Sequence, residues 1–252
     1  MTYSVIGTDV SFWQDAPSTT KHIDFAKMKA NGAEFVIIRA GQDGHGKDRD
    51  VDYNIPAAHD AGLIVGTYYM LDTHNLSGAV QADTYWSIIS KYASILDLPP
   101  VADFEYYHWA VKPSQTVAKG MLKTFLERMK VHSGKTSMIY TNGDSWRRYG
   151  GTETYWVQYP LWIAAYLVGQ PLPPAPFKSW MFWQFTDKGK GLDYGVESLS
   201  IDLNYWYGTK EQLYSFAGKQ PVEDTCCAYC LETRQRLEQL EKKVADMGLY
   251  FV

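Results

Sequence analysis

The segment Pro99-Pro100-Val101-Ala102-Asp103-Phe104-Glu105-Tyr106 decides how the rest of the chain is interpreted. Two prolines open a short apolar run, and the run ends in two carboxylates that are separated by one residue. Because side chains alternate along extended backbone, Asp103 and Glu105 are expected on one face, with Ala102 and Phe104 on the other. Adjacent carboxyl groups raise one pKa, as general acid catalysis requires, although a bare Asp-x-Glu could also simply face water.

The composition is that of a globular protein with a sizeable core. Of the 252 residues, 46% are hydrophobic and 21% are charged, both ordinary values. The net charge of −4 gives no basic surface, so we expect no binding to nucleic acid. The chain contains no long apolar run, so we expect no membrane span. Residues 1–7 lack a basic region followed by an apolar stretch, so we expect a protein made in the cytoplasm without a signal peptide.

The spacing of apolar segments favours a closed barrel. Successive strands among the first five lie about 25–38 residues apart, which is enough for a helical crossover between parallel strands. The last three lie only about 17–20 residues apart, and the proline-rich residues 171–176 cannot form a helix. We therefore predict an α/β fold, an irregular TIM-like (β/α)5β3 barrel. The predicted strands are residues 6–10, 35–38, 63–69, 101–105, 137–140, 161–166, 180–185 and 199–203, and the predicted helices are residues 23–32, 53–60, 77–93 and 113–132.

Polar and aromatic side chains fall at or near the C-terminal ends of these predicted strands, where the active sites of barrels lie. The acids predict a cleft of carbohydrate size and are Asp9, Asp103, Glu105 and Asp202. The candidate substrate-binding residues are Arg39, Tyr68, Tyr140, Trp162 and Gln184. Arg39 could equally neutralise the acids, and Asp9 and Asp202 could instead cap loops. The histidines lack the close spacing of a metal site, so we expect no metal and no cofactor.

A set of short motifs, in order along roughly residues 3–217, resembles the family-25 glycoside hydrolases. These are lysozymes that act as N-acetylmuramidases, and they include many phage endolysins. The motifs are GTDVSFWQ (7–14), IDF (23–25), FVIIRA (35–40), GTY (66–68), ADFE (102–105), IYTN (139–142), PLWIAAY (160–166), WQF (183–185) and IDLN (201–204). The chain departs from the family at Tyr69 and Met70, where many members have His-Phe, and at Phe25, which replaces a frequent Trp.

The resemblance implies hydrolysis of the β-1,4 bond between N-acetylmuramic acid and N-acetylglucosamine in bacterial peptidoglycan. Glu105 matches the family's general acid/base, Asp103 matches its partner carboxylate, and Asp9 and Asp202 match two further acids of the cleft. Asp103 could attack the anomeric carbon or orient the acetamido group of the substrate, and we favour the second, substrate-assisted route. The strand spacing of the two carboxyl groups does not decide between these routes.

The alternative is a non-catalytic barrel that binds peptidoglycan or another glycan. The presence of all four acids argues against it, because binding alone does not need Glu105. A chitinase-like enzyme is less consistent with the sequence, because Leu98 and Val101 occupy the places of two acids in the chitinase motif. We expect a phage endolysin or a virion-associated lysin, which acts on the bacterial cell wall after release or as part of a virion.

The domain prediction is a catalytic barrel over residues 1–217, a linker over 218–224 and an amphipathic C-terminal helix over 225–252. Apolar residues repeat at heptad spacing in the last segment, so it could form a homo-oligomer or dock on the barrel. Its cysteines, Cys226, Cys227 and Cys230, favour an intermolecular disulfide over a metal site, which would need a second pair of ligands.

Overall fold

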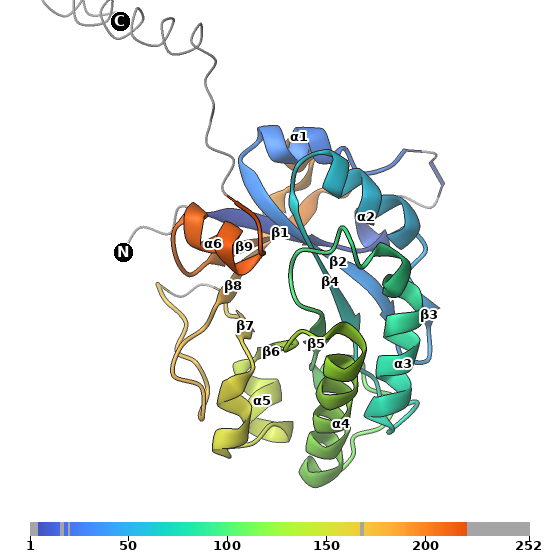
Figure 1. The fold of residues 1–252 in the computed structure, drawn as a ribbon, viewed down its shortest axis with the longest axis vertical. Coiled ribbons are helices and arrows are strands. Elements are labelled where there is room, and N and C mark those ends of the chain that lie inside the picture. The colour runs from blue at the N-terminus through green and yellow to red at the C-terminus, as the bar shows by residue number, and fades with distance from the viewer. Residues whose placement is uncertain (1–4, 16–17, 20, 167–168, 221–252) are drawn as a thin grey trace, which may run out of the picture. The chain divides into compact units, whose positions relative to one another are not determined.

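Eight strands form a closed ring in a computed structural model that describes residues 5–15, 18–19, 21–166 and 169–220 (Figure 1). Around the ring the strands follow the order β1-β9-β8-β7-β6-β5-β4-β2, and β1 pairs with β2 to close it. This arrangement confirms the predicted α/β barrel with five β/α units and three further strands. The strands are β1 (Ile6–Val10), β2 (Ala33–Gln42), β4 (Ile64–Met70), β5 (Val101–Asp103), β6 (Met138–Asn142), β7 (Leu161–Ala164), β8 (Phe182–Lys190) and β9 (Ser200–Trp206), and the two-residue β3 (Gly46–Lys47) forms a hairpin with β2.

The last strand of the ring runs against its neighbours. From β1 through β2 and β4 to β8, adjacent strands are parallel, whereas β9 is antiparallel to both β8 and β1. Asp202 was predicted near the C-terminal end of its strand, and this prediction was wrong. Asp202 is the third residue of β9, which continues to Trp206. It still reaches the mouth of the barrel because an antiparallel strand begins where its parallel neighbours end.

Most of the described α-helices begin at a residue whose side chain accepts a hydrogen bond from the first turn. The helices are α1 (Phe25–Ala30), α2 (Val51–Asp60), α3 (Gly78–Ile89), α4 (Gln115–Ser133), α5 (Gly143–Tyr149) and α6 (Lys210–Phe216). The side chains of Asp24, Ser77 and Ser114 accept hydrogen bonds from the first turns of α1, α3 and α4, which satisfies donors that a helix otherwise leaves free. Helix α4 ends at Gly134 in the left-handed conformation. Helices α5 and α6 were not predicted from the sequence.

Two apolar regions lie on opposite sides of the strands. In β2, Phe35 and Ile37 belong to one buried cluster with Trp162 and Phe182, while Val36 and Ile38 belong to another. The second cluster also contains helical residues, so it forms the layer between the barrel and the helices. Every residue from 35 to 38 is fully buried, as the continuous apolar run predicts. Side chains therefore fill the barrel interior, and open space is left at its mouth.

The described residues up to Lys219 form one compact unit. The side chain of Lys219 forms an ion pair with Asp97 at 2.9 Å, so the described unit extends slightly past the predicted end at residue 217. The rest of the predicted linker from residue 221, and the predicted helix over 225–252 with its cysteines and its role in oligomerisation, lie outside the described residues. Among the described residues, none of the helices has both the length and the apolar character that a membrane span requires.

Candidate active site

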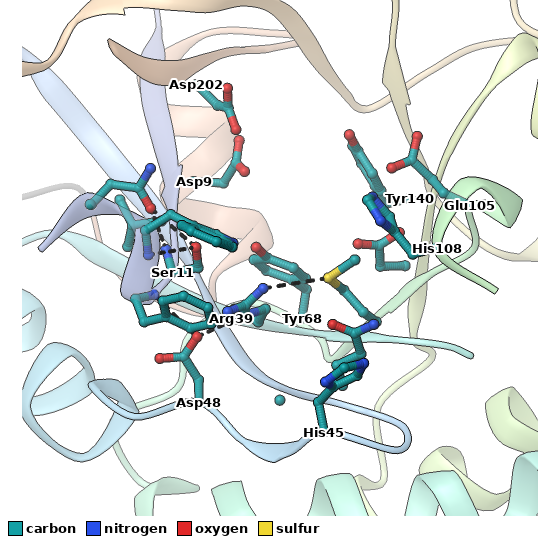
Figure 2. Close-up of a pocket in the computed structure, with 18 of the residues that line it drawn as sticks. Asp9, Ser11, Arg39, His45, Asp48, Tyr68, Glu105, His108, Tyr140 and Asp202 are labelled. Atoms are coloured by element: carbon teal, nitrogen blue, oxygen red, sulfur yellow. Dashed lines mark hydrogen bonds and ion pairs between the residues drawn. The ribbon is translucent and has the colours of Figure 1, made fainter. Parts of the chain in front are cut away.

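A pocket of about 650 Å³ opens at the end of the barrel toward which the parallel strands run (Figure 2). In Figure 2, Asp9 and Asp202 lie on one side of this pocket, and Glu105 lies on the other with Tyr140 and His108. All of the site residues predicted from the sequence line it, namely Asp9, Arg39, Tyr68, Asp103, Glu105, Tyr140, Trp162, Gln184 and Asp202. The structure thus brings the predicted residues together, while their individual roles stay predictions.

Asp9 and Asp202 are direct neighbours across the β1–β9 pair. Oδ2 of Asp9 accepts hydrogen bonds from Nε2 of Gln184 at 2.9 Å and Nδ2 of Asn204 at 2.8 Å. Burial raises the pKa of Asp9 to about 6, and these two bonds oppose the rise. Burial, with the negative charges of Asp9 and Asp187, raises the pKa of Asp202 to about 9. At neutral pH Asp202 therefore keeps its proton, and it can donate a hydrogen bond to the Asp9 carboxylate.

Asp103 and Glu105 enter the pocket from the end of β5. The prediction placed both acids on one strand, whereas β5 ends at Asp103. Glu105 nevertheless has extended backbone, with φ −129° and ψ 126°, so the two side chains share a face as predicted. Phe104 lies between them in sequence and packs on the opposite side against Trp109 and Trp146.

These two carboxyl groups have raised pKa values. Burial has the largest effect on the pKa of Asp103, the charges of Glu105 and Asp9 raise it further, and Arg39 opposes the rise. Burial also raises the pKa of Glu105, which is half-buried, and a hydrogen bond from Asn142 partly offsets that effect. Such an environment keeps a carboxylic acid protonated at a pH where an exposed one has ionised.

Arg39 is held by groups outside the four acids. Its Nε donates to Oδ2 of Asp48 at 2.8 Å, and its guanidinium lies 4.4 Å from the ring centre of Phe12. Its charge still lowers the pKa of Asp103. Its charge thus acts on one of the four acids, and its position in the pocket also allows contact with substrate, so both roles stay predictions.

The floor of the pocket is a hydrogen-bonded aromatic layer. The indole Nε1 of Trp162 donates to Oδ1 of Asn204 at 2.8 Å, and the hydroxyl of Tyr140 donates to Oε1 of Gln184 at 2.8 Å. Only 1% of Trp162 is exposed, so this ring supports the acids from below and offers little surface for stacking on a sugar. Tyr68 is half-buried and packs edge-on against Trp162.

The comparison with known families decides the identity of this barrel. Residues 8–193 match the model described as glycosyl hydrolases family 25. The chain belongs to this family. The resemblance seen in the sequence is thereby confirmed, and the protein is a glycoside hydrolase.

Relatives of this family-25 hydrolase include lysozymes and muramidases. It is 29% identical over 234 residues to Lysozyme M1 of Streptomyces globisporus, a match that covers 86% of this chain and 72% of the relative. The crystal structure of the bacterial lysozyme from Streptomyces coelicolor is 28% identical, with a TM-score of 0.74 over 86% of this chain and 98% of that one. The muramidase from Trichobolus zukalii is 30% identical, with a TM-score of 0.72 over 84% and 98% of the two chains.

The pocket of this family-25 hydrolase also contains residues that sequence reasoning missed. Phe12, Trp13, His45, His108, Tyr166 and Asp187 line it. Most of them lie outside regular periodic segments, so no strand pattern pointed to them. Asn142 and Asn204 support the site and could have been found, because each follows a predicted site residue by two positions in a strand.

No metal site accompanies these residues. Within the described ranges, no group of three or more His, Cys, Asp or Glu side chains is arranged to hold a metal ion.

Proposed function

We propose that this family-25 hydrolase is a lysozyme that cleaves the β-1,4 bond between N-acetylmuramic acid and N-acetylglucosamine in bacterial peptidoglycan. The observation that carries the proposal is the half-buried Glu105 among three further carboxyl groups, at the mouth of a barrel of this family. Relatives described as lysozymes and muramidases support the choice of substrate.

Glu105 is proposed to protonate the glycosidic oxygen as it leaves and then to activate water. The first step requires the neutral acid, and the raised pKa of Glu105 favours that form. Activity should therefore fall as the pH rises through the pKa of Glu105, because the proton to be donated is then lost.

Asp103 is proposed to orient the acetamido group of the substrate while that group attacks the anomeric carbon. Its burial and its raised pKa suit a hydrogen-bonding role next to the substrate amide better than a role as an exposed, ionised nucleophile. A glycosyl-Asp103 adduct trapped and detected by mass spectrometry would contradict this role.

The first test is digestion of purified peptidoglycan by the wild type and by Glu105→Gln. Products are reduced, labelled and identified by mass spectrometry. We expect new reducing ends on muramic acid, and a loss of about 10²–10⁴-fold in rate in the variant, the usual contribution of a general acid/base. Glu127→Gln is the matched control, because Glu127 is an exposed acid on α4 outside the pocket.

The other outcomes separate the alternatives. New reducing ends on glucosamine would support hydrolase activity but would show that a different glycosidic bond is cleaved. Binding to several wall types without any cleavage would favour the non-catalytic glycan-binding barrel.

The biological setting stays a prediction. We propose that the enzyme acts on the bacterial cell wall as a phage endolysin or a virion-associated lysin. Immunoblots of purified virions and of lysates, compared with the culture medium before lysis, test this proposal.

A further inference from the structure

The backbone that carries Glu105 is tied to β6 beyond the end of β5. The paired register of the two strands ends at Asp103 and Tyr140. Past that point, the N–H of Phe104 donates to the carbonyl of Tyr140 at 2.8 Å, and Oγ1 of Thr141 donates to the carbonyl of Phe104 at 2.9 Å. Nδ2 of Asn142 then donates to Oε1 of Glu105 at 2.5 Å. Three consecutive residues of β6 therefore hold the segment that carries the acid.

The orientation of the Asn142 amide is fixed from its other side. Its Oδ1 accepts hydrogen bonds from the N–H groups of Asp144 at 3.0 Å and Ser145 at 2.9 Å, because Asn142 is the N-cap of α5. Backbone N–H groups can only donate, so they require the amide oxygen. The amide nitrogen must then face Glu105, and rotating the amide by 180° would break both cap bonds.

We propose that Asn142 is a positioning residue that confines the proton of the acid Glu105 to Oε2. This inference rests on the proposed function of Glu105. An N–H donor needs a lone pair, so Oε1 accepts from Asn142 and cannot hold a proton directed at it. In the donation step the proton passes from Oε2 to the glycosidic oxygen, and Glu105 becomes a carboxylate. The same N–H of Asn142 then stabilises the new negative charge on Oε1.

The contact between Asn142 and Glu105 should affect the pKa of Glu105, which can be measured. Burial raises the pKa of Glu105, and the bond from Asn142 is the largest effect that lowers it. The other titratable groups that interact with Glu105 come from several elements and are Asp9, Asp103, Asp202, Tyr107, Tyr140 and Tyr166. His108 also lies on the same side of the pocket as Glu105. Because the Asn142 bond lowers the pKa of Glu105, loss of this donor should raise that pKa further.

The test uses substitutions that remove the hydrogen-bond donor of Asn142 but retain its role as the N-cap of α5. Asn142→Asp retains oxygens for the α5 N–H groups but replaces the donor with a second carboxylate facing Glu105. Asn142→Ser retains a capping hydroxyl and removes the amide donor. For both variants we expect kcat to fall about 10–100-fold with a small change in KM, since the acid is misplaced and not the substrate. The basic limb of the pH profile should move to higher pH, further for Asn142→Asp.

The control removes a helix cap away from the pocket. Ser114 caps α4, so Ser114→Ala should lower the melting temperature while leaving the pH profile unchanged. If the Asn142 variants behave like Ser114→Ala, with lower stability and an unshifted pH profile, the inference is overturned.

A second measurement does not depend on activity. A ¹³C NMR titration of the glutamate carboxyl groups, with Glu105 assigned by its absence in Glu105→Gln, reports the pKa of Glu105 directly. A higher pKa in Asn142→Ser than in the wild type supports the inference, because this variant removes the donor without adding a charge, and an equal or lower pKa overturns it. Absence of cleavage by the wild type would overturn the proposed function instead, and the titration would still decide the role of Asn142.

Discussion

Gln184 joins three parts of the cleft through one buried amide. Its Oε1 accepts from the hydroxyls of Tyr140 and Tyr166, and its Nε2 donates to Asp9. With both hydroxyls donating to the amide oxygen, the amide nitrogen faces Asp9 and donates to its carboxylate. Together with the Asn204 amide, this bond favours an ionised Asp9 beside a protonated Asp202.

Trp13 offers an apolar surface at the rim of the same pocket. The side chain is 69% exposed, and it projects from a short helical turn, Phe12–Gln14, that Ser11 and Gln14 hold by reciprocal capping bonds. Its ring is tilted against the ring of Phe12. A large exposed aromatic ring on a fixed turn beside an acidic pocket suits stacking on a sugar.

We predict that Trp13→Ala raises KM for peptidoglycan roughly 5–30-fold, the equivalent of one stacking contact, and changes kcat by less than about threefold. Steady-state kinetics on soluble glycan fragments measure both constants. Leu199→Ala is the control, because Leu199 is 89% exposed but does not line the pocket. An equal effect of the two substitutions on KM would argue against a sugar-binding role.

At the scale of elements, the packing of α3 on α4 depends on the absence of a side chain at Gly78. The two helices lie side by side in Figure 1. A Cβ at Gly78 would lie 1.8 Å from the carbonyl oxygen of Met121 and 2.7 Å from the backbone nitrogen of Phe125. Backbone atoms cannot move aside as the end of a side chain can, so the helices would have to separate.

We predict that Gly78→Ala destabilises the protein by about 2–4 kcal/mol, although Ala is the better helix former. Gly120→Ala is the matched control, because Gly120 lies inside α4 and a Cβ added there would meet nothing within 4 Å. That change should stabilise by up to about 1 kcal/mol. Urea denaturation of both variants measures the two effects, and a shift of the same sign in both would refute the steric argument.

Strand periodicity predicted most of the elements that position the site, and particular residues show why it stopped there. Alternation placed Asp103 and Glu105 on one face, even though the strand itself ends between them. Helix α5 has seven residues, and Ser145 and Trp146 are the ones it buries, so no helical period could form. The direction of β9 depends on its pairing with β1 and β8, which spacing along the chain does not report.

At the scale of the whole molecule, the acid pair couples stability to pH. The folded pKa values of Asp9 and Asp202, about 6 and about 9, both lie above the ordinary value of 3.8. The folded protein therefore binds these protons more tightly than the unfolded chain does. The resulting contribution to stability is fully present below about pH 4 and is lost as the pH rises through these two values.

We predict that Asp202→Asn is more stable than the wild type at pH 8 to 9, by about 1–3 kcal/mol or several degrees in Tm. The difference should shrink as the pH falls and vanish below about pH 3, where Asp202 is neutral in both the folded and the unfolded state. Thermal unfolding of the two proteins across this range measures the effect. Asp60→Asn changes an exposed acid outside the pocket and should show no such trend, and a gap that widens toward low pH would contradict the coupling.

Because β9 closes the ring, the site can form only after β9 has been synthesised. Asn204 and Asp9, which share a hydrogen bond, are 195 residues apart in the chain, and Gln184 and Asp9 are 175 apart. During translation, contacts between such distant residues must wait until the later partner has left the ribosome. Asp103 and Glu105 are synthesised well before Gln184 and Asn204, the residues that donate hydrogen bonds to Asp9. Because the chain is synthesised from the N-terminus, the complete cleft can assemble only after almost the whole barrel has been made.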